Sequence, residues 1–251
     1  GSEKAGASVA ESAGRALKKV VLELGGSDPF IVLDDVNLDD TIAAAASGRM
    51  SNAGQACTAA KRFIIVDSVY DRFVEGFAAK LQTYVAGDPL DPETNLGPLS
   101  SLGAVEELIE AVDDAVANGA TLVTGGHRIG EVGSFMAPTL LTDVTPKARA
   151  FHEELFGPVA VVYRVADKDA AIALANGSEF GLSSAVFGSN PDETAYVADR
   201  LESGMVYINE NTDSYVDLPF GGIKKSGFGR ELGHFGLDEF VNKKLIRTAA
   251  K

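Results

Sequence analysis

Short apolar segments alternate along the chain with longer amphipathic ones. The apolar segments cover residues 18–24, 30–33, 62–66, 120–125, 159–165, 183–188 and 204–209, and they are typical of buried strands. The amphipathic segments at 3–19, 38–54, 67–85, 104–119 and 190–204 fit helices. Strands that alternate with helices predict an α/β fold with a mostly parallel sheet.

Two segments interrupt this alternation. Residues 87–99 are rich in proline and glycine, which predicts a surface loop. Residues 218–236 read "LPFGGIKKSGFGRELGHFG", and a long glycine-rich run inside a compact chain often has a function.

Composition excludes several classes of protein. The net charge is −14 and no run of lysine and arginine stands out, so the sequence predicts neither a nucleic-acid partner nor an anionic membrane partner. The chain has no apolar run of membrane-spanning length and no signal-peptide pattern. Cys57 is the only cysteine, which fits a reducing compartment, and we expect a cytoplasmic protein. No metal site is expected.

Cys57 lies in the segment "NAGQACTAAKR", just past the end of the expected helix at 38–54. Most free cysteines are small buried hydrophobes. Here Ala53, Gly54 and Ala56 leave room for a substrate, and Asn52 and Gln55 can hydrogen-bond the turn. An exposed turn suits a nucleophile better than a core position does.

A nucleophilic thiol needs a base. The three histidines, His127, His152 and His234, lie in no pattern that singles one out, so a Cys–His hydrolase is the weaker hypothesis. Glu23 is a charge inside an apolar segment, two positions before a Gly-Gly break. It fits either an outward side chain on an edge strand or a carboxylate at the carboxyl end of a parallel strand. In the second case, partial burial would raise its pKa toward neutrality and make it a general base.

Four motifs in order resemble those of the aldehyde dehydrogenase superfamily. They are "GSEKAG" at the start, "LELGG" followed 34 positions later by the Cys of "GQAC", "EELFGPV" at 153–159, and "PFGGIKKSGFGRELG" at 219–233. Each is weak alone, whereas the ordered set is specific. The resemblance runs from Gly1 to about Ile246 and is strongest to the succinate-semialdehyde dehydrogenase-like branch.

The resemblance implies a fold and an activity. Residues 1–24 would be the last helix and strand of a Rossmann-like cofactor domain, 25–225 the catalytic domain with a mostly parallel twisted sheet, and 226–251 a tail with an inter-subunit strand. The implied reaction is NAD- or NADP-dependent oxidation of a small aldehyde, such as succinate semialdehyde, to the carboxylic acid. It would pass through a thiohemiacetal and a thioester on Cys57, with Glu23 activating water.

The resemblance also implies roles for further residues. Gly1, Ser2, Leu24, Gly25, Glu154 and Phe156 would contact the cofactor, and Arg62 and Phe220 would lie on the substrate side. Asp217 stands where some relatives carry a basic residue, and this departure counts against an acidic substrate.

The chain matches only the C-terminal half of such enzymes, which form homodimers or homotetramers. Most of the cofactor domain, an oxyanion-hole asparagine and the dimerisation hairpin have no counterpart here. Two alternatives therefore stand beside the dehydrogenase: an inactive domain with a structural or binding role, and a thiol esterase that uses Cys57.

Overall fold

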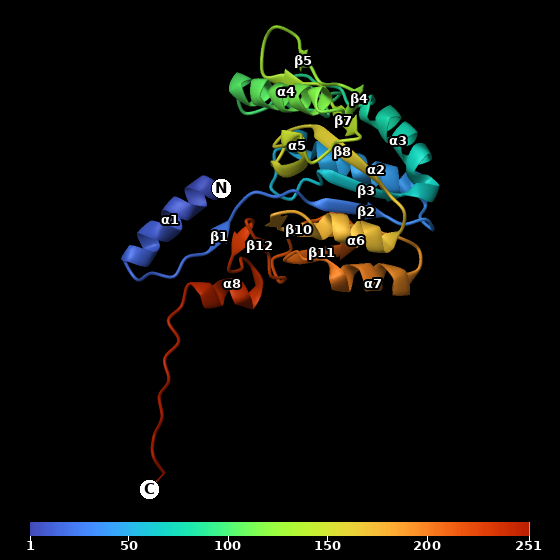
Figure 1. Ribbon diagram of the computed structural model, residues 1–251. Helices are drawn as coiled ribbons and strands as arrows, with labels where there is room; N and C mark the ends of the chain where they lie inside the picture. Colours follow the sequence, from blue (N-terminus) through green and yellow to red (C-terminus); the bar gives the residue numbers. More distant parts are fainter. Residues whose placement is uncertain (251) are drawn as a thin grey trace.

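A seven-stranded sheet forms the centre of the protein (Figure 1). The structure is a computed structural model that describes residues 1–250. The strand order is β11-β10-β2-β3-β8-β7-β4, and every neighbouring pair is parallel except β4 and β7. The strands are β2 (Pro29–Val32), β3 (Arg62–Val66), β4 (Thr121–Thr124), β7 (Thr139–Thr142), β8 (Val159–Val165), β10 (Ser183–Phe187) and β11 (Met205–Ile208). The prediction of an α/β fold with a mostly parallel sheet is confirmed.

The central strands are continuous apolar runs because helices cover both faces of the sheet. On one face, α2 (Leu38–Met50) packs against α3 (Asp67–Leu81). On the other, α6 (Lys168–Asn176) packs against α7 (Pro191–Arg200). In the strand order, the crossover β2-α2-β3 steps toward β4, whereas the crossover β10-α7-β11 steps the other way, to the β11 edge. Because both crossovers are right-handed, α2 and α7 lie on opposite faces of the sheet. The helix α4 (Leu102–Ala117) packs against the short α5 (Arg149–His152) beside β4.

Two of the buried strands that the sequence predicts are confirmed only in part. The segment 18–24 forms only the two-residue strand β1 (Leu22–Glu23), which pairs antiparallel with β13 (Gly227–Phe228) outside the main sheet. The segment 120–125 becomes β4, an antiparallel edge strand whose residues are largely exposed. The buried β7 and the helix α6 were not predicted. The sequence of β7 is a run of only four residues, "TLLT", which is too short to show a period.

Short elements complete the chain. They are the 3₁₀ turn η1 (Ser51–Gly54), β5 (Arg128–Ile129) paired with β6 (Phe135–Met136), β9 (Phe180–Gly181) paired with β12 (Ile223–Lys224), and α8 (Gly233–Glu239). The glycine-rich segment 218–236 thus supplies β12 and β13, and the latter holds the strand that carries Glu23.

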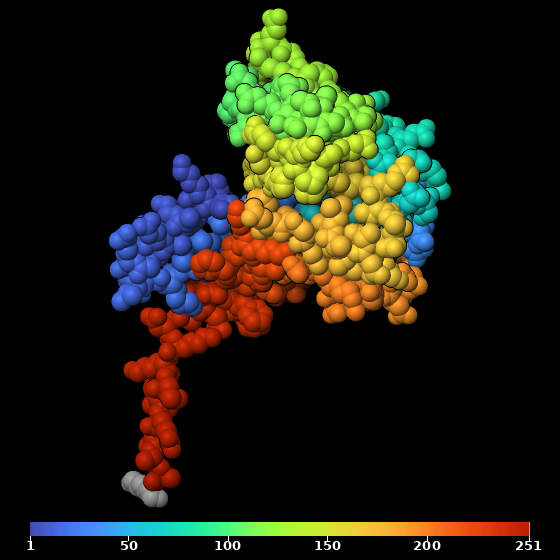
Figure 2. Space-filling model, viewed as in Figure 1, coloured from blue at the N-terminus to red at the C-terminus, as the bar shows by residue number. Residues whose placement is uncertain are grey.

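The two ends of the chain lie beside the sheet rather than within it. Helix α1 (Glu3–Arg15) stands apart from the main sheet, and residues 241–250 run away from the body without regular structure (Figures 1 and 2). Apolar side chains at both ends are exposed, among them Val9, Leu17, Leu245 and Ile246. The proposed domain limits of 1–24, 25–225 and 226–251 remain a prediction. None of the helices in residues 1–250 is both long and apolar enough to cross a membrane.

Candidate active site

The residues of the candidate site come from segments that immediately precede parallel strands. Glu23 to Asp28 lead into β2, Cys57 precedes β3, and Glu154 precedes β8. Because β2, β3 and β8 are neighbours and parallel, their starts lie at one edge of the sheet. The site therefore lies at the amino edge of the sheet. Glu23 itself lies in β1, which within the described residues pairs antiparallel with β13 outside the main sheet.

The loop that carries Cys57 is held in an unusual backbone conformation. Asn52, Ala53 and Gly54 have φ values of 50°, 55° and 74°, so three consecutive residues are left-handed. Such a conformation is costly for alanine and persists only where the surroundings enforce it. The Asn52 and Gln55 side-chain amides each donate to the other residue's carbonyl, at 3.0 and 3.1 Å, as predicted. Gln55 also accepts a hydrogen bond from the Ser100 N–H at 2.8 Å, which ties the loop to the start of α4.

Glu23 has a carboxylate with no hydrogen-bond partner in the described structure, although both oxygens are buried. Burial raises its pKa from 4.5 to about 7; Glu231 adds to the rise, whereas Arg230 and the amino terminus oppose it. The glycine-rich segment surrounds this carboxylate, because Leu24 donates its N–H to the Ser226 carbonyl at 3.1 Å and β13 pairs with β1. A carboxylate with a pKa near neutrality and free oxygens can take a proton from water.

Glu154 is fixed to the segment that follows Glu23. Its Oε1 accepts a hydrogen bond from the Gly26 N–H at 2.9 Å. A Cβ on Gly25 would lie 2.6 Å from Oε2 of Glu154, so a larger residue at position 25 would displace this carboxylate. The Glu154 carboxylate is thus held in place by one oxygen, and Oε2 makes no recorded bond within residues 1–250. A carboxylate placed in this way can accept hydrogen bonds from the hydroxyls of a ribose.

Three carboxylates act on the thiol of Cys57. Burial raises the pKa of the partly buried Cys57 thiol, and the charges of Asp28, Glu154 and Glu23 raise it further. The resting group is therefore the thiol rather than the thiolate. Gly26, three residues after Glu23, links these segments: its N–H donates to Glu154, and a Cβ on Gly26 would lie 2.2 Å from the Cys57 carbonyl oxygen.

Asp28 was not predicted as a site residue. It is fully buried and accepts hydrogen bonds from the Ser183 N–H at 3.2 Å and from the Ser183 hydroxyl. Burial raises its pKa from 3.8 to about 7, against the lowering effect of these bonds and of Arg62. Nothing in the local sequence "GGSDPF" marks it as buried, because aspartate is common in turns.

The buried Asp28 makes stability depend on pH. The folded protein keeps this proton up to about pH 7, whereas the unfolded chain loses it near the ordinary value of 3.8. The stabilising contribution is therefore full below pH 4 and is lost as the pH rises through 7. In the parent chain, Asp28 should make the free energy of unfolding fall by roughly 3 kcal/mol between pH 5 and pH 8. We expect Asp28→Asn to abolish this fall.

Urea denaturation of the parent chain and the variant at both pH values measures this difference. The exposed Asp34 provides the control, since Asp34→Asn should keep the pH dependence of the parent. An Asp28→Asn variant with the parent's pH dependence would contradict the assignment.

Arg62 has a structural role, and its expected place on the substrate side remains a prediction. Its side chain is 5% exposed, and its guanidinium donates to the carbonyls of Ser27, Leu174 and Ala175 at 2.7, 2.9 and 3.0 Å. Leu174 and Ala175 are in the last turn of α6, where carbonyls lack helical partners. Arg62 therefore caps α6 with two of its five N–H donors and holds the Ser27 carbonyl with a third.

The other predicted residues lie around the same edge. Gly1 donates its amine to the Glu23 carbonyl at 2.6 Å, and Ser2 caps α1 by accepting from the Ala5 N–H. The Leu24 side chain packs against Gly6 of α1, so only its backbone faces the site. Phe156 is 47% exposed beside the Glu154 turn. Phe220 is partly buried and forms an isolated antiparallel β-bridge with Glu231. Their roles toward cofactor and substrate remain predictions.

The histidines do not support a Cys–His pair. His127 bonds the Gly125 carbonyl, His152 bonds the Pro146 carbonyl, and His234 stacks on Phe235. All three are exposed, and none is among the groups whose charge shifts the Cys57 thiol. Within residues 1–250, no three His, Cys, Asp or Glu side chains are grouped to hold a metal ion.

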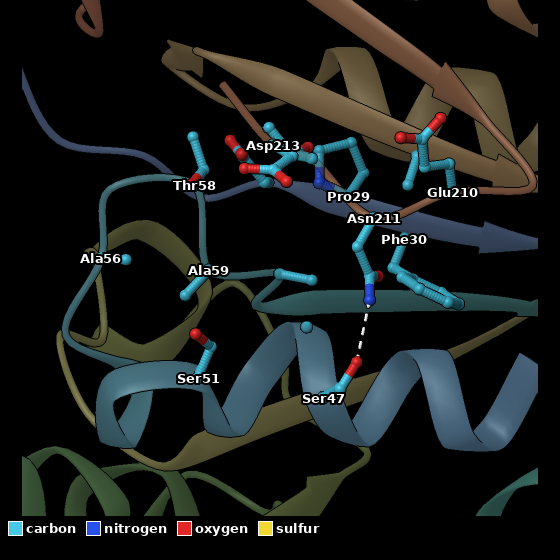
Figure 3. A pocket seen from close by; sticks show the side chains of 15 residues that line it. Pro29, Phe30, Ser47, Ser51, Ala56, Thr58, Ala59, Glu210, Asn211 and Asp213 are labelled. Atoms are coloured by element: carbon cyan, nitrogen blue, oxygen red, sulfur yellow. Dashed lines mark hydrogen bonds between the residues drawn. The ribbon is translucent and has the colours of Figure 1, made fainter. Parts of the chain in front are cut away.

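A cavity of about 440 Å³ adjoins the nucleophile loop (Figure 3). Ala56 and Thr58, the two neighbours of Cys57, line it, together with residues 210–213 after β11 and the end of α2. In Figure 3, Thr58 and Asp213 lie at one end, and Asn211 donates to Ser47 of α2 at 3.0 Å. Three acidic residues line the cavity. Asp28 keeps its proton up to about pH 7 because burial raises its pKa, so the negative charge of the cavity comes from Glu210 and Asp213. The sequence pattern did not indicate residues 210–213, because they lie in a polar loop.

Comparison with known proteins agrees with this arrangement. The model of the "Aldehyde dehydrogenase family" matches residues 1–246. Among similar proteins, the "Succinate-semialdehyde dehydrogenase [NADP(+)]" of Deinococcus radiodurans is 62% identical over 99% of this chain and 52% of its own length. The Escherichia coli "Succinate semialdehyde dehydrogenase [NAD(P)+] Sad" is 49% identical over 98% of this chain and 53% of its own.

Solved structures show the same likeness. The succinic semialdehyde dehydrogenase of Streptococcus pyogenes in complex with NADP+ superposes with a TM-score of 0.97 at 45% identity, covering 99% of this chain and 55% of its own. The chain thus spans about half the length of the relatives it matches. Its sequence motifs, its fold and the grouping of Cys57, Glu23 and Glu154 lead to one conclusion: the chain belongs to the aldehyde dehydrogenase family.

Proposed function

We propose that this chain forms the catalytic half of an NADP- or NAD-dependent aldehyde dehydrogenase, with succinate semialdehyde or a similar small aldehyde as the substrate. The observation that carries the proposal is the position of Glu23, a free, buried carboxylate with a pKa near 7 among the groups that surround the single thiol. The names of the relatives support the aldehyde and the nucleotide.

The first step is attack on the aldehyde. The Cys57 thiol gives up its proton to solvent water, and the sulfur forms a bond to the carbonyl carbon. The carbonyl π electrons move to the oxygen, which becomes a thiohemiacetal oxyanion. The N–H of Cys57 can donate to such an oxygen. The cavity would receive the rest of the aldehyde, since Ala56 and Thr58, which precede and follow Cys57 in the sequence, both line it.

The second stage is oxidation and release. A nicotinamide nucleotide supplies the two-electron oxidation by accepting hydride from the carbon bound to sulfur. Glu154 would hold the nicotinamide ribose, because its carboxylate is anchored by Gly26 and has Oε2 available. Loss of hydride leaves a thioester on Cys57. Glu23 then takes a proton from water, the resulting hydroxide attacks the thioester, and the carboxylic acid leaves as Cys57 regains its proton.

The lining of the cavity affects the choice of aldehyde. Glu210 and Asp213 would repel a substrate carboxylate, and the exposed Asp217 adds no positive charge. If the substrate is succinate semialdehyde, the cation that pairs with its carboxylate must come from outside these lining residues. A screen of neutral and acidic aldehydes tests the substrate class: preference for neutral aldehydes would reject succinate semialdehyde.

The 251-residue chain alone should bind nicotinamide nucleotides weakly. The residues that could hold the nucleotide, such as Glu154 and Ser2, account for the nicotinamide end, and the chain spans about half the length of its relatives. We expect no saturable binding of NAD or NADP at micromolar concentrations in isothermal calorimetry, and little or no oxidation of aldehydes. The relative from Deinococcus radiodurans is the positive control. Tight binding by the isolated chain would overturn this expectation.

Two activity assays, ester cleavage and aldehyde oxidation, separate the alternatives. Cleavage of p-nitrophenyl acetate that needs Cys57 but no nucleotide would support a thiol esterase. A chain that neither cleaves esters nor oxidises aldehydes when a cofactor half is supplied would support the inactive domain.

A further inference from the structure

Arg49 is a buried cation next to the site that the reaction described above does not use. Its side chain is 1% exposed and is among the largest fully buried side chains. It lies in the last turn of α2, directly before η1 and the nucleophile loop. Buried charges are rare unless they are paired, because desolvation costs several kcal/mol per ion.

The bonds of Arg49 are directed at the nucleophile loop. Its Nη2 donates to the Gly54 carbonyl at 2.7 Å, three residues before Cys57. Gly54 in turn lies against the turn after Glu154: a Cβ on Gly54 would be 2.1 Å from the Gly157 carbonyl oxygen and 2.8 Å from Nη2 of Arg49. Arg49 therefore lies where the nucleophile loop meets the Glu154 turn.

Hydrogen bonding alone does not explain the burial of Arg49. Arg62, which is equally enclosed, uses three donors on three carbonyls. Arg49 has one recorded hydrogen bond, and its Nε is buried without a partner within the described residues. A guanidinium has five N–H donors, so a purely structural arginine would satisfy more of them.

The charge of Arg49 is balanced by two carboxylates of the site. Burial lowers the pKa of Arg49 to about 10. The charges of Glu154 and Asp28 oppose this lowering and favour the charged guanidinium. Burial raises the pKa of the Glu154 carboxyl, and the Gly26 hydrogen bond and the charge of Arg49 oppose this rise. Glu154 and Asp28 are two of the three carboxylates that disfavour the Cys57 thiolate, the third being Glu23. Arg49 thus partly offsets the negative charge that faces the nucleophile.

We propose that Arg49 is a positioning residue for the nucleophile: it fixes the loop through the Gly54 carbonyl and offsets the charges of Asp28 and Glu154 around Cys57. This inference rests on the proposed function only in taking Cys57 as the nucleophile. Its test measures the thiol itself and needs no nucleotide, so failure of aldehyde oxidation and failure of this inference are separate results.

The experiment uses the fact that Cys57 is the only thiol in the chain. The rate of alkylation by iodoacetamide is measured from pH 6 to pH 10.5 on the 251-residue chain. The midpoint of the pH–rate profile reports the thiolate fraction, and the plateau at high pH reports access to the sulfur. We expect Arg49→Met to raise the midpoint by at least about half a pH unit, which makes alkylation about threefold slower below the midpoint.

Two further variants separate charge from hydrogen bonding. Arg49→Gln keeps a donor for the Gly54 carbonyl but not the charge, and it should shift the midpoint as Arg49→Met does. It also replaces Arg49→Met if that variant does not fold. Arg49→Lys keeps the charge and should restore the midpoint. Burial lowers the pKa of Lys61, and the charges of Arg62 and Arg49 lower it further. Lys61 can gain a proton when Arg49 is neutralised, so the measured shift is a lower limit for the effect of the Arg49 charge.

A control for lost stability comes from the core. Phe77 is fully buried against Phe63 and Phe73, and Phe77→Leu should lower the melting temperature without moving the midpoint. An unchanged midpoint in both neutral Arg49 variants would overturn the proposal. So would an equal shift in Phe77→Leu, since Arg49 would then act only through overall stability.

Discussion

Replacing Cys57 by alanine is expected to abolish aldehyde oxidation. The test protein joins the amino-terminal half of the Deinococcus radiodurans relative to this chain, which aligns with the other half at 62% identity. Without the sulfur no thiohemiacetal forms, so there is no covalent intermediate from whose carbon hydride can be transferred. Removal of a catalytic nucleophile costs roughly 10⁶-fold in the best-studied hydrolases, and a loss of at least about 10³-fold is expected here.

The measurement is the rate at which NADPH appears from succinate semialdehyde and NADP. The affinity for NADP, followed by fluorescence, should remain near that of the parent fusion and serves as the control for folding. An alanine variant that retains a tenth of the parent rate would exclude Cys57 as the nucleophile.

Replacing Glu23 by glutamine is expected to stop the enzyme after the first turnover. Acylation does not need the Glu23 carboxylate in the proposed sequence, whereas hydrolysis of the thioester does. In the same fusion, stopped-flow measurement should show a burst of one NADPH per active site, followed by a steady-state rate about 10²- to 10⁴-fold below that of the parent.

The pH dependence provides an independent check. Glu23 must be deprotonated to accept a proton, and its pKa in this chain is about 7, so the steady-state rate of the parent should rise as the pH increases through 7. That inflection should be absent in Glu23→Gln. Glutamine is close in shape to glutamate, which limits structural effects. A variant with no burst, or with a normal steady-state rate, would count against Glu23 as the base.

The sequence predicted the centre of the fold well because the central strands are buried on both faces. The segments 30–33, 62–66, 159–165 and 183–188 are continuous apolar runs, and each forms a strand of the main sheet. Where burial is incomplete the pattern misled. The apolar residues of 120–125 lie on an exposed edge, and those of 18–24 pack against the glycine-rich segment instead of entering the sheet.

The site could be predicted only in part, and the reason is physical. Cys57, Glu23 and Glu154 are unusual for their local contexts or belong to recognisable motifs, so the sequence singled them out. Asp28 and Arg49 became visible only once the fold showed that they are buried, because a charged residue in a turn or at a helix end is ordinary in a sequence. Arg62 shows the converse: a residue close to the nucleophile in the sequence bonds instead to the end of α6.

The position of the site at the amino edge of the sheet has a consequence for the fate of the thiol under oxidative stress. Helices that lead into strands at this edge present their carboxyl ends, and α2 ends at Met50, shortly before Cys57. The partial negative charge of a helix carboxyl end disfavours a nearby thiolate, whereas reactive cysteines in redox proteins often lie at helix amino ends. Peroxide reacts with thiolates, so Cys57 should form sulfenic acid slowly in the resting protein. The position of Cys57 after the carboxyl end of α2 should therefore slow the oxidation of its thiol by peroxide while no substrate is bound.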